Sequence, residues 1–142
     1  MAIVQSEGFA HVRLTVTDIV RSKAFYDQVF GWPVAADESA AVNEPGVRDD
    51  PARLYGGCVY QTPQGALFGL RPVGAEEFDA DRTGLDHLSF GVSSRADLEK
   101  AATALDEAGI PRGEVTDLTE MGAAILSFQD PDDINIELSA QL

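Results

Sequence analysis

The sequence of 142 residues is poor in basic side chains and in cysteine, and each scarcity excludes a class of protein. Ten Lys and Arg stand against 24 Asp and Glu, and the resulting net charge of −14 repels nucleic-acid phosphates. No nucleic-acid partner is therefore expected. The single cysteine, Cys58, cannot form an internal disulfide, which is typical of a protein in the reducing cytoplasm.

Long apolar runs are also absent. No segment reaches the length that a membrane-spanning helix needs, and the start, MAIVQSEGF, has no basic stretch followed by an apolar one. We therefore expect neither a membrane partner nor a signal peptide. The hydrophobic share of 44% and the charged share of 24% are typical of a soluble globular protein, and the length favours one domain.

The sequence does contain an internal repeat. The segments GFAHVRLTV at 8–16 and GLDHLSFGV at 84–92 share one pattern, and each has one of the two histidines, His11 and His87, in fourth place. Each is followed by a polar cap, a helix-like stretch and a Gly-x-Pro stop. Each half then ends on a similar segment, TPQGALFGL at 62–70 and DPDDINIEL at 130–138. Several matched features in the same order indicate a duplication.

Each half is typical of a βαβββ module. HVRLTV and HLSFGV alternate between apolar and polar residues, as half-buried strands do, and short strand-like runs follow each helix-like stretch. We predict an α+β protein in which two tandem βαβββ modules form a curved mixed sheet. Residues 1–142 are then one domain, with module 1 at about 6–74, a linker at about 75–83 and module 2 at about 84–142. Residues 36–53 are expected to be a long surface loop with one short strand.

The alternation also predicts which side chains share a face. If the apolar residues of the two first strands pack on the helices, then His11 and His87 point away from them. In the last strand, INIELSA, Glu137 likewise lies opposite the apolar face. An inward carboxylate is costly without a compensating charge, and two imidazoles with one carboxylate suit Fe²⁺, Mn²⁺, Zn²⁺, Ni²⁺ or Co²⁺. We predict that His11, His87 and Glu137 bind such an ion, against the simpler interpretation that the histidines are only hydrogen-bonded.

The repeat assigns Glu137 a counterpart in module 1, which is Gly69. A fourth ligand position is thus left without a carboxylate, and an open position favours a catalytic site over a structural one. Glu137 is the candidate catalytic residue.

Other residues are candidates for substrate binding. Arg13 and Arg71 fall on the same side as the histidines and could hold an anionic substrate, although solvated arginines at a rim fit equally well. Aromatic side chains could line the site or fill the core, namely Trp32, Tyr60 and Phe128. Cys58 is most simply a small buried residue.

At these residues the sequence resembles the vicinal oxygen chelate superfamily, the glyoxalase/bleomycin-resistance/dioxygenase group. HVRLTVTDIVRSKAFYDQVFGW is similar to its opening strand and helix, and DPDDINIEL is similar to its closing Asp-Pro-Asp-Gly-x-x-Ile-Glu-Leu, with Asp133 in place of the glycine. The resemblance implies a vicinal oxygen chelate domain whose metal ligands map to His11, His87 and Glu137. It also implies a homodimer. Because glyoxalase I-like members add a carboxylate at the position of Gly69, that activity is disfavoured.

Two functions follow as hypotheses. The first is a metal-dependent lyase, isomerase or dioxygenase that acts on a small molecule with adjacent oxygens. The second is a metal-free protein that binds a drug or metabolite in an aromatic cleft, with His11 and His87 hydrogen-bonded instead.

Overall fold

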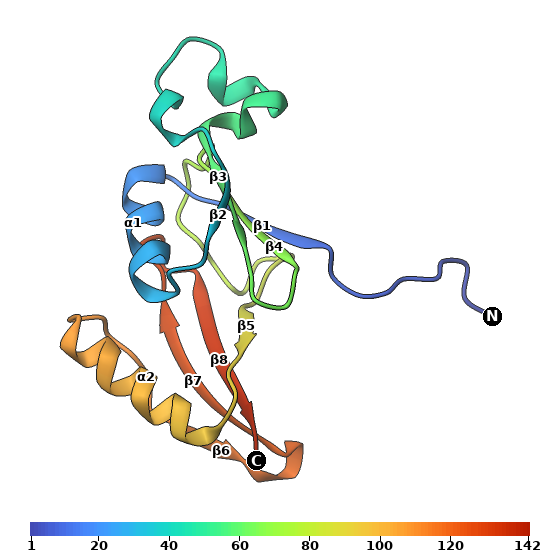
Figure 1. Ribbon diagram of the computed structural model, residues 1–142, viewed down its shortest axis with the longest axis vertical. Coiled ribbons are helices and arrows are strands. Elements are labelled where there is room, and N and C mark those ends of the chain that lie inside the picture. The colour runs from blue at the N-terminus through green and yellow to red at the C-terminus, as the bar shows by residue number, and fades with distance from the viewer. The chain divides into compact units, whose positions relative to one another are not determined.

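The structure is a computed structural model that describes residues 1–142, and the chain divides into two units, Met1–Glu76 and Glu77–Leu142. Each unit contains one strand, one helix and three further strands in that order (Figure 1). The strands form two four-stranded mixed sheets, one in each unit. The α+β class and the two-module architecture are therefore as the sequence predicts.

The first unit contains the strand order β1-β4-β3-β2, in which β1 is parallel to β4 and the other neighbours are antiparallel. Its elements are β1 (His11–Thr15), α1 (Ile19–Val29), β2 (Val34–Asp37), β3 (Cys58–Gln61) and β4 (Leu67–Arg71). The segment expected as a long loop contains the end of β2 and then three 3₁₀ turns, η1 (Ser39–Ala41), η2 (Val47–Asp49) and η3 (Pro51–Gly56). The loop is thus more ordered than its composition indicates, because Ala41, Val42 and Val47 are buried within it.

The second unit repeats this arrangement with the order β5-β8-β7-β6, and β5 is parallel to β8. Its elements are β5 (Leu88–Gly91), α2 (Arg95–Glu107), β6 (Thr116–Leu118), the 3₁₀ turn η4 (Thr119–Met121), β7 (Ala123–Gln129) and β8 (Asn135–Gln141). The last strand of each unit lies between the first and the third. It is therefore central in its sheet.

Local sequence sets the ends of both helices. Asp18 caps α1 by accepting a hydrogen bond from the Arg21 amide, and Ser94 caps α2 by accepting one from the Asp97 amide. After each helix a glycine adopts the left-handed conformation, with φ of 59° at Gly31 and 71° at Gly109. Neither helix has the length and apolar content that a membrane crossing requires.

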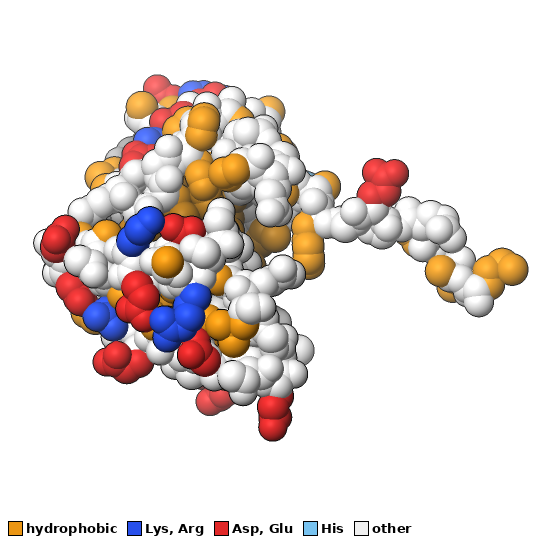
Figure 2. Space-filling view, turned by 60° about the horizontal axis from the view of Figure 1, so that its bottom comes forward, with side chains coloured by type: hydrophobic (Ala, Val, Ile, Leu, Met, Phe, Trp, Pro, Cys, Tyr) orange, Lys and Arg blue, Asp and Glu red, His pale blue; other side chains and the backbone are white.

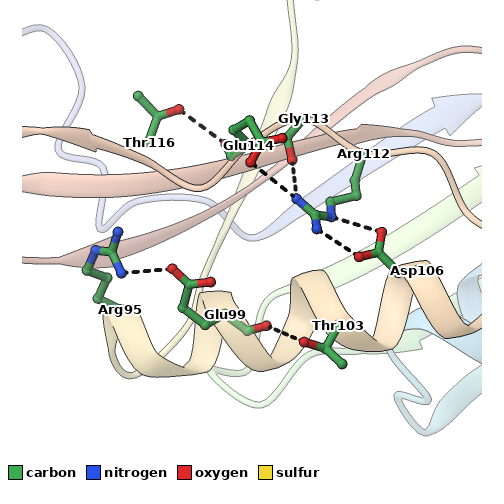
Figure 3. A network of polar contacts seen from close by, with 8 residues as sticks. All are labelled: Arg95, Glu99, Thr103, Asp106, Arg112, Gly113, Glu114 and Thr116. Atoms are coloured by element: carbon green, nitrogen blue, oxygen red, sulfur yellow. Dashed lines mark hydrogen bonds and ion pairs between the residues drawn. The ribbon is translucent and has the colours of Figure 1, made fainter.

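Each helix covers one face of its own sheet. In the second unit α2 contacts β7 and β8, and Leu98, Ala102 and Leu105 are its buried residues. Burial of each leucine side chain contributes about 1.5–3 kcal/mol. The outer face of α2 carries ion pairs instead, from Arg95 to Glu99 and from Arg112 to Asp106 (Figure 3). Figure 2 shows the same mixture of basic and acidic side chains on the molecular surface.

The opposite face of each sheet carries the polar side chains. Along β1, Leu14 is buried while His11, Arg13 and Thr15 are exposed. Along β8, Ile136, Leu138 and Ala140 are buried, and the residues between them are partly exposed. The faces that the alternation predicts are therefore present in each sheet.

Candidate metal and substrate site

His87 and Glu137 lie together in the second unit. His87 immediately precedes β5, and Glu137 stands on β8 opposite Ser89 of β5. The imidazole Nε2 lies 3.7 Å from Glu137 Oε2. The Glu137 side chain is 17% exposed, so its carboxylate is largely desolvated on the face opposite α2. The structure thus brings two of the three expected metal ligands to one place.

A second acidic residue, Asp86, belongs to this group, and the sequence analysis does not predict it. Its Oδ1 lies 2.5 Å from His87 Nδ1, and the Asn135 side-chain amide donates to the Asp86 carbonyl. A carboxylate at Nδ1 fixes the imidazole tautomer and leaves Nε2 available as a ligand. The only signal in the sequence is the adjacency of Asp86 to His87, which does not define the direction of the carboxylate.

The surroundings of His87 favour positive charge. The hydrogen bond to Asp86 raises the pKa of His87, and the charges of Glu137 and Asp86 raise it further, against the opposing effect of burial. The same two carboxylates would stabilise any cation held at this position.

The donor set fits a divalent metal ion. Two atoms that each lie about 2.1 Å from one ion are about 3.0 Å apart at an octahedral angle and about 3.4 Å apart at a tetrahedral one. The 3.7 Å between Nε2 and Oε2 therefore needs only a small side-chain movement. Neither unit by itself holds three His, Cys, Asp or Glu side chains in a group that could bind a metal. His87 and Glu137 are thus two of the three expected ligands, and the third, His11, stands on the exposed face of β1 in the first unit.

The first unit carries a different group on its polar face. The guanidinium carbon of Arg71 lies 4.1 Å from the centre of the Tyr55 ring, and that of Arg13 lies 5.4 Å from it. Arg13 stands opposite Gly69 in the register of β1 and β4, as Ser89 stands opposite Glu137 in the second unit. The two units are therefore alike in backbone and opposite in the charge of this face.

The aromatic candidates lie elsewhere. Tyr60 is fully buried and donates to Asp27 of α1, and Phe128 is 4% exposed among the core residues of β7. Their burial agrees with the alternative that these rings fill the core, and a role in substrate binding stays a prediction. Trp32 stacks on Phe30 and meets Phe68 edge-on, so it belongs largely to the same helix-side packing. Strand alternation predicted that Arg13 and Glu137 lie on the polar faces, as the structure shows. The rings of Tyr60 on β3 and Phe128 on β7 lie instead on the helix side of their sheets.

The fold and the polar faces define a class of paired βαβββ proteins. The family model for the glyoxalase/bleomycin resistance protein/dioxygenase superfamily matches residues 8–138. The chain belongs to this superfamily.

Solved structures agree with this membership. A glyoxalase/bleomycin resistance protein/dioxygenase domain from Frankia sp. EAN1pec is 29% identical, with a TM-score of 0.77, over 97% of this chain and 94% of that one. A glyoxalase/dioxygenase from Nostoc punctiforme is 21% identical, with a TM-score of 0.72, over 100% and 99%. A mutant of the fosfomycin resistance protein FosX from Listeria monocytogenes is 15% identical, with a TM-score of 0.73, over 97% and 95%. A search of curated proteins finds no match.

Proposed function

We propose that the protein is a divalent-metal-dependent enzyme that acts on a small molecule with adjacent oxygens, in a lyase, isomerase or dioxygenase type of reaction. His87 and Glu137 supply two ligands and His11 the third. The observation that carries the proposal is the 3.7 Å approach of His87 Nε2 to Glu137 Oε2, with Asp86 at the other ring nitrogen. Such an ion would act as a Lewis acid on the substrate oxygens.

The structural neighbours support metal dependence, but they do not favour a particular reaction. The Listeria monocytogenes FosX structure is a complex with Mn(II) and 1S,2S-dihydroxypropylphosphonic acid. Because Gly69 stands where a fourth carboxylate would be needed, we do not propose the glyoxalase I reaction. We propose further that the protein is a cytoplasmic homodimer, and that Arg13 and Arg71 lie near the bound substrate.

The metal proposal is tested by elemental analysis of untagged protein. We expect close to one divalent ion per chain in the wild type. We expect its loss in His87→Ala and Glu137→Gln, because removal of one ligand from a three-ligand set lowers metal affinity by orders of magnitude. His11→Ala should weaken binding in the same way.

The control is Glu107→Gln, which changes the charge as Glu137→Gln does but lies exposed at the end of α2. It should retain the metal. Wild-type protein without metal, which also fails to bind added Mn²⁺, Zn²⁺ or Fe²⁺ in calorimetry, would contradict the proposal. Equal metal loss in the control would show that net charge and not ligation is responsible.

The second candidate is a metal-free binding protein. The position of the His87 ring between Asp86 and Glu137 favours it, since a protonated imidazole would pair with both carboxylates and need no metal. In that case ligand-induced shifts in melting temperature persist in metal-stripped protein. Shifts that need added metal would leave the enzyme as the only candidate.

A further inference from the structure

Two arginines of the first unit converge on one tyrosine ring. We infer that Arg13, Arg71 and Tyr55, here called the arginine cluster, bind an oxyanion group of the small-molecule ligand. This group is a carboxylate, a phosphonate or a phosphate. The inference deepens the proposed function by naming the chemical class of the substrate. It rests on that function only in taking the ligand to be a small molecule.

Strand register brings the cluster together. Arg71 stands at the end of β4, where Phe68 and Leu70 are buried toward α1, so Arg71 falls on the opposite face. Arg13 is two residues before Thr15, which is the partner of Arg71 in the parallel register of β1 and β4. Both side chains therefore rise from the same face, beside the strand position that His11 occupies.

Gly69 makes room for one of the arginines. A Cβ atom built on Gly69 would lie 3.2 Å from Cγ and 3.5 Å from Nε of Arg13. The stem of Arg13 thus crosses the strand at the position equivalent to Glu137. The missing carboxylate is replaced by a guanidinium, so the position is cationic and not vacant.

Neither guanidinium is neutralised. The protein has more than twice as many acidic as basic residues, and several other basic side chains are in ion pairs, as Figure 3 shows for Arg95 and Arg112. No carboxylate pairs with Arg13 or Arg71, and Arg71 Nε is buried without a hydrogen-bond partner. Two adjacent like charges repel, and an unpaired buried donor is unfavourable. An oxyanion that binds to these guanidinium groups would offset the repulsion and supply an acceptor for the unpaired donor, and arginine is the side chain best suited to bind it in a bidentate manner.

The backbone that carries Tyr55 is strained. Leu54 has φ of 51° and Tyr55 has φ of 57°. Residues other than glycine rarely adopt this left-handed conformation. Gly56 continues the turn with φ of 80°. Glycine at position 57 lets this turn approach β4, since a Cβ there would lie 1.9 Å from the Leu70 carbonyl oxygen. The turn places the Tyr55 ring within cation–π distance of both guanidinium groups.

The test follows the arginine side chains directly. Metal-stripped protein, freed of chelator by gel filtration, is titrated with acetate, methylphosphonate or neutral acetamide while the arginine Nε–H signals are recorded by NMR. We expect both oxyanions to shift the signals of Arg13 and Arg71, and acetamide to leave them in place. The anion with the lower Kd, acetate or methylphosphonate, shows whether the site prefers a carboxylate or a phosphonate.

Variants define the role of each residue. Arg71→Gln and Arg13→Gln should each raise the Kd for the preferred anion about tenfold or more, the loss expected for a charge-assisted hydrogen bond. Lys100→Gln makes the same change in net charge on the exposed side of α2 and should leave the Kd unchanged. Tyr55→Leu should weaken binding several-fold, whereas Tyr55→Phe, which keeps the ring, should restore most of the affinity.

Two results would contradict the proposed anion site. No shift of the Arg13 and Arg71 signals with any anion, or the same Kd in the Arg13→Gln/Arg71→Gln double variant as in the wild type, would overturn the inference. Because the titration is done without metal, a negative result leaves the metal proposal standing. A negative metal analysis likewise leaves this site standing.

Discussion

At the scale of single residues, one pair of equivalent positions separates the two halves of the chain. Glu137 and Gly69 occupy the same place in β8 and β4, each opposite a residue of the parallel first strand. On one side the carboxylate faces His87, and on the other the glycine admits the side chain of Arg13. A duplicated backbone therefore carries an imidazole–carboxylate pair in one unit and two guanidinium groups beside a tyrosine ring in the other.

The thiol of Cys58 gives a prediction at this scale. Burial raises its pKa to about 11 from an ordinary value of 9.0, and the hydrogen bond with Tyr60 offsets only part of this. Because the thiolate is the reactive form, native protein should react with a disulfide reagent at about pH 8 roughly a hundredfold more slowly than urea-unfolded protein. Equal rates in the native and the unfolded protein would show that the thiol is exposed.

The raised pKa of Cys58 also predicts how the stability of the protein depends on pH. The raised pKa in the folded state means that the unfolded chain loses this proton first, so stability is intact below about pH 9 and falls as the pH rises toward 11. Between about pH 9 and pH 10 the wild type should lose about 1 kcal/mol more unfolding free energy than Cys58→Ala does. Urea denaturation at several pH values measures both slopes, and parallel slopes would contradict the prediction.

At the scale of elements, the first helix is fixed to its sheet by one buried polar contact. Tyr60 of β3 donates to Asp27 of α1 over 2.8 Å, and Asp27 also pairs with Lys23 over 2.7 Å. The tyrosine ring lies among the aromatic side chains of this layer, with Phe68 stacked on it. The contact joins a helix and a strand that lie more than 30 residues apart in the sequence.

Tyr60→Phe should therefore reduce the unfolding free energy by about 1 kcal/mol, the usual value of one buried hydrogen bond. Anion and metal binding should not change, since the ring lies on the helix side of the sheet. Tyr55→Phe is the matched control, because no hydrogen bond holds its hydroxyl group, and its effect on stability should be within about 0.5 kcal/mol. Impaired ligand binding in Tyr60→Phe would return this residue to the substrate site.

At the scale of the whole molecule, the proposed metal site needs His11 beside the pair in the second unit. The three ligands come either from one chain or from two chains of a homodimer. Suppose that His11 comes from one chain and that His87 and Glu137 come from the other. In that case a mixture of His11→Ala and His87→Ala chains contains mixed dimers with one intact site. Random pairing makes half of the dimers mixed, with one of two sites intact, so about a quarter of the wild-type metal content should return.

The experiment is done by unfolding and refolding the two variants together, with each variant refolded alone as the control. Metal recovery only in the mixture supports a shared site. No recovery in a sample that sedimentation shows to be dimeric places all three ligands in one chain. A monomeric wild type would contradict the dimer itself.

The fold was largely predictable because it depends on local and periodic signals. Asp18 and Ser94 cap the helices, Gly31 and Gly109 end them, and the alternation in β1 and β8 assigns a face to each side chain. The repeat then implies that both halves share one topology. Periodicity could not show that Tyr60 and Phe128 face the helices, because that depends on how the hairpin strands are registered against their neighbours.

The sequence by itself determined the duplication, the two βαβββ modules and the candidates His11, His87 and Glu137, because residue spacing along a strand or helix decides which face a side chain occupies. Only the tertiary structure decided that Asp86 orients His87, and that Arg13 fills the place left by Gly69 beside Tyr55. These contacts depend on side-chain direction and on a strained left-handed turn. Neither side-chain direction nor a turn of this kind leaves a periodic trace in the sequence.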